Sequence, residues 1–389
     1  MNIKDMISPA VKNMPPSGIR KYFDLINEMK DAISLGIGEP DFVTPWNIRE
    51  AGIYSLEKGH THYSSNAGFI ELREEIARYM KRRFDLEYDP RKQVLVTVGG
   101  SESIDIALRA LVGKGDEVII PEPSFVAYKG CVVFTGATPV IVNLRAEDQF
   151  RLTPEILEKS LTPRTKVVIV PYPNNPTGAI MTKEDLRKIV EILKDRDIIV
   201  ISDEIYAELT YEGRHVSIAS FPGMKKKTLV INGFSKAYAM TGWRLGYACG
   251  HEDLIDAMNR IHQYAIMCSP TTAQYAAIEA LRGSDDDVRM MVREYNLRRR
   301  IMVDGFRKAG LDCFEPLGAF YVFPSIKSTG MKSDEFCEKL LMEEKVLVIP
   351  GNSFGSCGEG FIRATYANST ENIIEALKRI QGFVERKRR

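Results

Sequence analysis

VVIVPYPNNPTGAIMTKEDLRKIVEILKDRDIIVISDEIY, residues 167–206, has two apolar segments with an amphipathic segment between them. The runs at 167–170 and 198–202 are almost continuously apolar, which is typical of strands buried on both faces of a sheet. Between them, Thr182 can cap a helix, with Asp185 three residues later and apolar positions following at helical spacing. The stretch therefore predicts two parallel strands joined by a helix.

Similar runs lie on both sides of this unit and alternate with helical patterns from about residue 94 to residue 250. These runs are residues 94–98, 117–120, 139–142 and 228–231. Their alternation with helices predicts an α/β fold, with a mainly parallel sheet covered by helices.

The C-terminal third has a different pattern. A helix is expected to start at Ser284, with acidic residues at 285–287 near its positive end, and to stop near Gly310. At more than 20 residues it can connect two domains. Short strands at 319–323 and 345–349 and a C-terminal helix then predict a smaller α+β domain. We place the large domain at residues 45–284 and the small domain at 1–44 and 285–389.

Composition excludes several classes of protein. The chain has 389 residues, 44% hydrophobic and 27% charged, and a net charge of +1, which points to neither a nucleic acid nor an anionic membrane surface. No apolar run approaches the roughly 20 residues that span a bilayer, and residues 1–15 do not resemble a signal peptide. The six cysteines are scattered and form no CxxC pair, which favours reduced thiols in the cytoplasm. His60 and His62 alone do not predict a metal site.

Polar residues follow the predicted strands, where open α/β sheets bind ligands. After residue 98, the turn Gly99-Gly100-Ser101-Glu102-Ser103 leads into a helix and can expose N–H groups to a phosphate. It matches neither a dinucleotide fingerprint nor a P-loop. Asp203, Lys236 and Arg244 follow later strands, and a buried charge there is costly unless it has a partner.

These segments together resemble the class I aminotransferases, which are pyridoxal 5′-phosphate (PLP) enzymes of fold type I. The resemblance covers nearly the whole chain and is closest to the branch that acts on aromatic amino acids and aspartate. It rests on SGIRKYFDL (17–25), LGIGEPDF (35–42), THYSSNAG (61–68), NNPTG (174–178), SDEIY (202–206), SKAYAMTGWRLG (235–246), PGNSFG (350–355) and FIRATYA (361–367).

The resemblance implies a role for each residue around the cofactor ring. Lys236 would form the internal aldimine and move protons at the substrate Cα, with pyridoxamine phosphate as the other cofactor form. Asp203 would pair with the pyridine nitrogen. Asn175 and Tyr206 would bond to the ring 3-oxygen, and Phe125 would stack on the ring.

The same resemblance assigns the cofactor phosphate and the substrate. The phosphate would be held by Gly100, Ser101, Glu102, Ser235 and Arg244, and by Tyr63 of a neighbouring subunit in a homodimer with a shared active site. The substrate α-carboxylate would be held by Arg363, Gly38 and Asn175. Trp243 is expected to be a packing residue.

One departure concerns Ser101. Some aspartate-specific relatives have a lysine at this position to meet the distal carboxylate, and serine cannot supply that charge. The sequence therefore favours an aromatic or broad amino-acid substrate, with a 2-oxo acid such as 2-oxoglutarate as the acceptor.

Three other functions stay open from the residues. The same scaffold also supports carbon–sulfur β-lyases. A PLP-sensing regulator would need a DNA-binding domain, for which the arm before residue 17 is too short. A hydrolytic Ser235–Lys236 pair would give a colourless protein.

Overall fold

The computed structural model describes residues 1–15, 18 and 31–387 of the chain. Of the segment SGIRKYFDL at 17–25, only Gly18 lies within these ranges.

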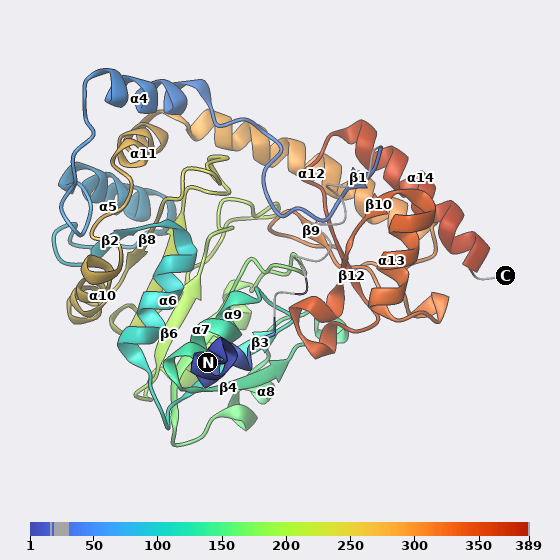
Figure 1. Cartoon of the computed structure of the whole chain (residues 1–389), viewed down its shortest axis with the longest axis horizontal. Coiled ribbons are helices and arrows are strands. Elements are labelled where there is room, and N and C mark those ends of the chain that lie inside the picture. The colour runs from blue at the N-terminus through green and yellow to red at the C-terminus, as the bar shows by residue number, and fades with distance from the viewer. Residues whose placement is uncertain (16–17, 19–30, 388–389) are drawn as a thin grey trace.

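A seven-stranded sheet with strand order β2-β8-β7-β6-β5-β3-β4 forms the centre of the molecule (Figure 1). The neighbouring strands from β7 through β6, β5 and β3 to β4 are parallel, whereas β8 is antiparallel to both β2 and β7. The strands are β2 (Val94–Thr97), β3 (Glu117–Glu122), β4 (Thr138–Asn143), β5 (Thr165–Val170), β6 (Ile199–Asp203), β7 (Thr228–Gly233) and β8 (Gly246–Cys249). The mainly parallel sheet is thus confirmed. The sequence did not predict β8, because its four residues include only one large apolar side chain, Tyr247.

Helices cover both faces of this sheet. Along β5, Val167 and Ile169 pack into one layer and Val168 and Val170 into the opposite layer, and all four are buried. Burying each such side chain stabilises the fold by roughly 1.5–3 kcal/mol. One layer contains α6 (Gly99–Leu111), α7 (Ala127–Thr135) and α10 (Glu252–Ala265). The other contains α4 (Trp46–Glu57), α5 (Ile70–Phe84), α8 (Pro154–Ser160), α9 (Lys183–Leu193) and α11 (Thr271–Gly283).

The predicted unit at 167–206 is confirmed in detail. Helix α9 connects the parallel strands β5 and β6. The Asp185 N–H donates to the Thr182 hydroxyl at 3.1 Å, and the Thr182 N–H donates to the Asp185 carboxylate at 2.9 Å. This reciprocal capping satisfies two N–H groups that have no partner within the helix.

Helix α12 (Asp285–Lys308), 24 residues long, runs from the large sheet to the C-terminal elements (Figure 1). Its predicted length and its end before Gly310 are confirmed. The expected cap differs: the Ser284 hydroxyl makes no capping bond to the helix and instead accepts from Asn47 Nδ2 at 2.9 Å.

The C-terminal elements build a second, smaller sheet. β11 (Ile349–Pro350), β12 (Ile362–Thr365) and β9 (Tyr321–Val322) are antiparallel in the order β11-β12-β9. β1 (Ile33–Ser34) pairs in parallel with β10 (Val346–Leu347), so this part of the N-terminal segment lies with the C-terminal elements. α13 (Ser333–Glu344) and α14 (Thr370–Lys387) pack beside them. The domain limits at residues 44/45 and 284/285 stay a prediction.

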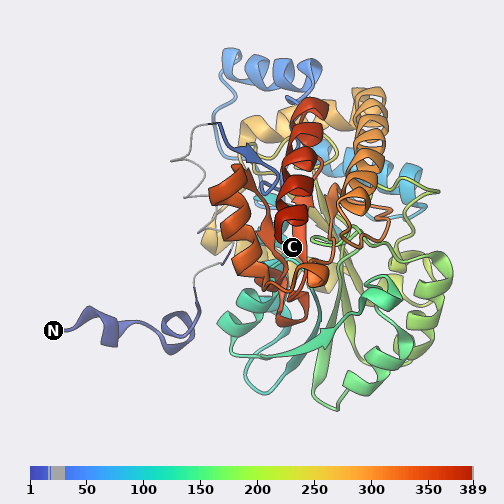
Figure 2. The ribbon, with the colours of Figure 1, turned by 90° about the vertical axis from the view of Figure 1, so that its right-hand side faces the viewer.

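The N-terminal helices α1 (Ile3–Met6) and α2 (Pro9–Lys12) extend to one side of the molecule (Figure 2). Across the described residues, the structure contains no helix with the length and apolar character needed to cross a membrane.

Candidate active site

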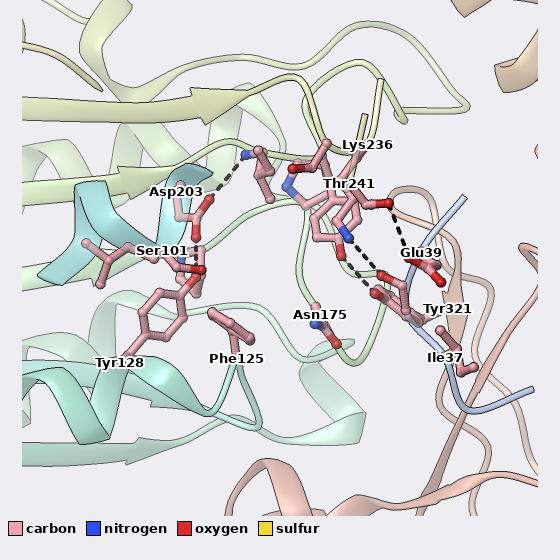
Figure 3. A pocket seen from close by; sticks show the side chains of 18 of the residues that line it. Ile37, Glu39, Ser101, Phe125, Tyr128, Asn175, Asp203, Lys236, Thr241 and Tyr321 are labelled. Carbon is pink, nitrogen blue, oxygen red and sulfur yellow. Dashed lines mark hydrogen bonds between the residues drawn. The ribbon is translucent and has the colours of Figure 1, made fainter. Parts of the chain in front are cut away.

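A cavity of about 550 Å³ lies at the carboxyl ends of β5, β6 and β7 and reaches the small sheet (Figure 3). It brings together eleven of the thirteen residues proposed from the sequence. They are Gly38, Gly100, Ser101, Phe125, Asn175, Asp203, Tyr206, Ser235, Lys236, Arg244 and Arg363. Glu102 and Tyr63 do not line it.

Lys236 points into this cavity from the loop after β7. Its Nζ donates to the Gly38 carbonyl at 2.7 Å. Burial lowers the Lys236 pKa from 10.5 to about 8, because an ammonium group loses hydration there. The nearby Glu39 carboxylate opposes this shift, and the Arg363 and Arg244 cations add to it. A lysine with this pKa has about a tenth of its amine neutral and nucleophilic at pH 7, far more than an ordinary lysine.

Asp203 is the last residue of β6 and faces the other end of the cavity. Tyr128 Oη donates to its Oδ2 at 2.6 Å and the Ile205 N–H to its Oδ1 at 3.2 Å. Asp203 is 7% exposed, and in the described part of the chain no cation lies within ion-pair distance of it. Burial raises the Asp203 pKa, while the two hydrogen bonds work in the opposite direction. The site therefore favours a cationic group in front of this carboxylate.

The turn at the start of α6 lies against Arg244. Gly99 has a positive φ of 76°, which favours glycine there, and a Cβ at this position would lie 2.8 Å from Arg244 Nη2 and displace the guanidinium. Arg244 Nη1 donates to the Thr241 carbonyl at 3.0 Å. N–H groups at a helix start beside a guanidinium form an environment suited to a phosphate.

Glu102 lies in the first turn of α6, but its carboxylate is engaged elsewhere. One carboxylate oxygen accepts from the Val98 N–H, and the other contacts His262 Nδ1 at 2.7 Å. Sequence reasoning proposed backbone and side-chain contacts to the phosphate for Ser101 and Glu102. Ser101 lines the cavity, whereas both oxygens of the Glu102 carboxylate are engaged by Val98 and His262, so the side-chain contact expected for Glu102 is not prepared in the structure.

Arg363, on β12, is 3% exposed at the small-sheet end of the cavity. Its Nη1 donates to Asn175 Oδ1 at 3.0 Å and its Nη2 to the Gly36 carbonyl. Its Nε is buried without a hydrogen-bond partner among the described residues. Tyr321 and Phe354 lie 4.6 and 4.7 Å from the guanidinium, measured to their ring centres, and burial lowers the Arg363 pKa. A buried cation with an unused donor is suited to an anionic ligand.

Aromatic side chains shape the space between these charges. Tyr206 and Tyr321 share a hydrogen bond of 2.8 Å between their hydroxyl groups. Gly38 is required opposite them, since a Cβ there would be 2.4 Å from Tyr321 Oη. Phe125 packs edge-to-face with Tyr128 at 5.7 Å, and Figure 3 places it between Asp203 and Asn175.

Tyr63 lies outside the cavity and is 77% exposed. It lines a second hollow together with His60 and His62. The described ranges contain no group of three or more His, Cys, Asp or Glu side chains that could hold a metal ion. Trp243 packs against Gly52, and its Nε1 donates to the Thr44 hydroxyl at 3.1 Å, in agreement with a packing role.

Four lining residues with a hydroxyl or carboxyl side chain were not proposed from the sequence: Tyr128, Tyr321, Glu39 and Thr241. Thr241 Oγ1 donates to Glu39 Oε2 at 3.2 Å across the cavity. Glu39 and Thr241 lie inside the segments that carry the family resemblance, so that signal was available. Tyr128 and Tyr321 have no sequence signal of this kind, because ordinary aromatic core residues look the same.

Comparison with known proteins gives consistent matches over nearly the whole chain. The family model described as "Aminotransferase class I and II" matches residues 30–380. A protein of Bacillus subtilis (strain 168), YugH, whose name assigns it provisionally to the aminotransferases, is 53% identical over 98% of this chain and 98% of its own length.

Two further relatives differ in the substrate that they are named for. An aspartate aminotransferase of Pyrococcus abyssi (strain GE5 / Orsay) is 44% identical over 96% of this chain and 97% of its own. The crystal structure of an aromatic aminotransferase from Pyrococcus horikoshii OT3 superposes with a TM-score of 0.90 at 42% identity, covering 95% of this chain and 99% of that one. Two relatives with nearly the same sequence identity to this chain are thus named for different substrates.

Proposed function

Because this chain belongs to the class I and II aminotransferases, which are PLP-dependent enzymes, we propose that it transfers an amino group between an L-amino acid and a 2-oxo acid such as 2-oxoglutarate. The amino acid is proposed to be aromatic, or one of a broad range. The observation that carries the proposal is that Asp203, Lys236 and Arg363, which lie far apart in the sequence, line a single cavity.

The residues of the cavity fit the cofactor. When bound, PLP acts as an electron sink that makes the substrate Cα–H bond acidic. Asp203 supplies a buried carboxylate without a protein cation in the described residues, which suits a protonated pyridine nitrogen. The start of α6, Ser235 and Arg244 supply donors that suit the phosphate group.

Lys236 is proposed to hold the cofactor covalently through Nζ and to move the proton at the substrate Cα. Both tasks require the amine to lose its proton near neutral pH, and burial lowers its pKa to about 8. The Gly38 carbonyl orients Nζ in the cofactor-free geometry.

Three further side chains are proposed to fix the cofactor ring. Phe125 provides an aromatic face, and Tyr206 and Asn175 provide hydrogen-bonding groups in the same cavity. Tyr206 is held by Tyr321, and Asn175 is held by Arg363, so both are oriented before a ligand arrives.

Arg363 is proposed to bind the substrate α-carboxylate. Its planar guanidinium matches a carboxylate in a two-point contact, and its Nε has no partner in the described residues. Gly38 lets the backbone approach that carboxylate, because any side chain there would collide with Tyr321.

The substrate side chain is proposed to be uncharged. Ile37, Ile104, Phe125 and Ile205 contribute apolar surface to the cavity, and Ser101 brings no positive charge. This preference rests on the lining residues, since the relatives are named for both aspartate and aromatic substrates.

A homodimer is proposed as the working state. Tyr63 is exposed and does not reach the cavity of its own chain, which suits a contact with the phosphate in a second subunit. Trp46, Tyr54 and Tyr264 are also exposed and provide apolar surface for a partner. The cytoplasm as compartment stays a prediction from the scattered cysteines.

The visible spectrum of the PLP-loaded protein tests the activity and its substrate together. L-tyrosine, L-aspartate and L-alanine are added separately, without an oxo acid. Rapid conversion of the cofactor to its amino form by tyrosine is the expected result. Conversion by aspartate or alanine alone would contradict the proposed substrate. Pyruvate and ammonia released from cystathionine, with no conversion by any of the three, would identify a β-lyase.

A further inference from the structure

A buried pair, His262 and Glu102, lies directly behind the turn at the start of α6. His262 is in the last turn of α10 and is fully buried, with 0% exposure. Its Nδ1 lies 2.7 Å from Glu102 Oε1. An ionised carboxylate only accepts hydrogen bonds, so Nδ1 is the donor in this contact. Helix α10 is thereby tied to the turn that leads from β2 into α6.

The second oxygen of Glu102 is also occupied. Oε2 accepts from the N–H of Val98, the residue immediately before α6. Glu102 thus accepts a hydrogen bond from the turn before α6 with one oxygen and from His262 with the other. Its side chain is only 9% exposed, so the carboxylate has little water to replace either partner.

The position of this carboxylate matters for a phosphate. Gly100 and Ser101, in the same helical turn as Glu102, line the cavity, and Arg244 lies against Gly99. A carboxylate that turned toward this side would repel a phosphate dianion, and the repulsion is strong where water is scarce. The two hydrogen bonds hold the Glu102 charge on the far side of the turn.

We propose that His262 is a positioning residue for the cofactor phosphate, acting through Glu102. It holds the Glu102 carboxylate on the Val98 N–H, which keeps the start of α6 open to an anion. The inference rests on the PLP dependence of the family and not on the proposed substrate, so its failure would leave the transamination proposal standing.

A purely structural role for His262 makes a different prediction. A core histidine that only fills space would, when replaced, weaken binding of every form of the cofactor to the same extent. The His262 Nε2 is buried without a hydrogen-bond partner among the described residues, so within them the side chain of His262 is held by the contact of Nδ1 with Glu102. The discriminating quantity is therefore how much tighter the protein binds PLP than pyridoxal, which lacks the phosphate.

The experiment measures the dissociation constants of PLP and pyridoxal for cofactor-free protein by absorbance titration. For His262→Leu, PLP affinity is expected to fall about tenfold, the effect of losing one hydrogen bond to a charged group. Pyridoxal affinity is expected to change little, so the phosphate preference falls by the same factor.

Two further variants test the path of the effect. His262→Asn keeps an amide donor near the position of Nδ1 and is expected to retain most of the phosphate preference. Glu102→Gln combined with His262→Leu removes the charge that His262 restrains, and should restore the preference toward the wild-type value.

Met258→Ala is the matched control, since Met258 is also fully buried on α10 but has no bond to Glu102. It should leave the phosphate preference unchanged even if the protein becomes less stable. Equal losses for PLP and pyridoxal in His262→Leu, no loss for either, or a lower phosphate preference in Met258→Ala would each overturn the proposal. If His262→Leu does not fold, His262→Phe, which keeps a ring at this position but cannot donate to Glu102, gives the same comparison alone and combined with Glu102→Gln.

Discussion

The two ends of the cavity are built in different ways. The cofactor wall consists of Asp203, Ser235, Lys236, Arg244 and the start of α6, all at the edge of one seven-stranded sheet. The substrate wall consists of Gly38, Tyr321 and Arg363, which come from a loop and two short strands of the small sheet. Gly36 and Arg363, bonded to each other there, are 327 residues apart.

Each wall nevertheless contains a charged side chain that is at most 7% exposed, and these two charges have opposite signs. On the cofactor wall it is the Asp203 carboxylate, and on the substrate wall it is the Arg363 guanidinium. Neither is in an ion pair within the described ranges, although buried charges are costly without partners. The comparison indicates two ligand groups, a cation at Asp203 and an anion at Arg363. Variants that affect one wall should therefore separate the two binding events.

The largest effect is expected for Lys236→Ala, which removes the residue of the cofactor wall whose Nζ reaches Gly38 on the substrate wall. Transamination should fall by at least about 10⁴-fold, because the same amine attaches the cofactor and transfers the proton. Initial rates with saturating PLP measure this loss. Lys225→Ala, on the surface near Tyr88, is the control and should keep full activity.

Asp203→Asn should damage the cofactor wall alone. Losing one member of a buried ion pair costs about 3–5 kcal/mol, so kcat should fall by roughly two to four orders of magnitude. The effect on folding stability of the cofactor-free protein should be the opposite of a loss. Burial raises the Asp203 pKa, so the charged carboxylate destabilises the folded state when no cofactor is present. Urea unfolding near pH 7 should find the cofactor-free variant at least as stable as the wild type. A large loss of stability would show that Asp203 already has a cationic partner.

Arg363→Lys should damage the substrate wall alone. Lysine keeps the charge but loses the planar two-point contact, so kcat/KM for the amino acid should fall about 10–100-fold. The dissociation constant for PLP should stay close to the wild-type value. Arg187→Lys, in an exposed pair with Glu184, serves as the control for the substitution itself. Equal weakening of cofactor and amino-acid binding would break the distinction between the two walls.

The pH dependence of stability tests the environment of Lys236 without any ligand. Its pKa is lowered from 10.5 to about 8 by burial, so below about pH 8 the folded protein bears the full cost of a buried ammonium. That cost is relieved as the pH rises from about 8 to about 10.5, where the unfolded chain binds more protons. Relative to Lys236→Met, the cofactor-free wild type should therefore gain stability across this range, as measured by urea unfolding. A constant difference would show that Lys236 is well hydrated.

The smallest effect is expected far from both walls. Thr182→Ala removes the side-chain cap of α9 and should lower the free energy of unfolding by about 1 kcal/mol. Catalysis should be unchanged, because α9 lies outside the cavity. A combined measurement of the urea midpoint and kcat tests both statements.

The difference between the cofactor wall and the substrate wall also explains which parts of the site could be predicted from the sequence. The strands of the cofactor wall are continuous apolar runs, so their ends, and with them Asp203 and Lys236, could be located from local pattern. The substrate wall depends on strands of two to four residues and on contacts such as Gly36 with Arg363, which have no local signature. Arg363 was found only through family resemblance.

The sequence also could not predict the directions in which side chains of the site point. The family resemblance implied that Glu102, like Ser101, contacts the phosphate. Its carboxylate instead bonds to Val98 and His262, and His262 lies 160 residues away in the sequence. Tyr128 and Tyr321 could not be predicted as site residues either. Only the folded chain brings the Tyr128 hydroxyl to Asp203 and the Tyr321 hydroxyl to Tyr206.

The most direct test of the account is to reduce the PLP-loaded protein with borohydride and map the modified peptide by mass spectrometry. The account predicts one phosphopyridoxyl group per chain, attached to Lys236, and no labelling in Lys236→Ala. A label on another lysine, or a protein that takes up no PLP, would contradict the assignment of this cavity as the active site.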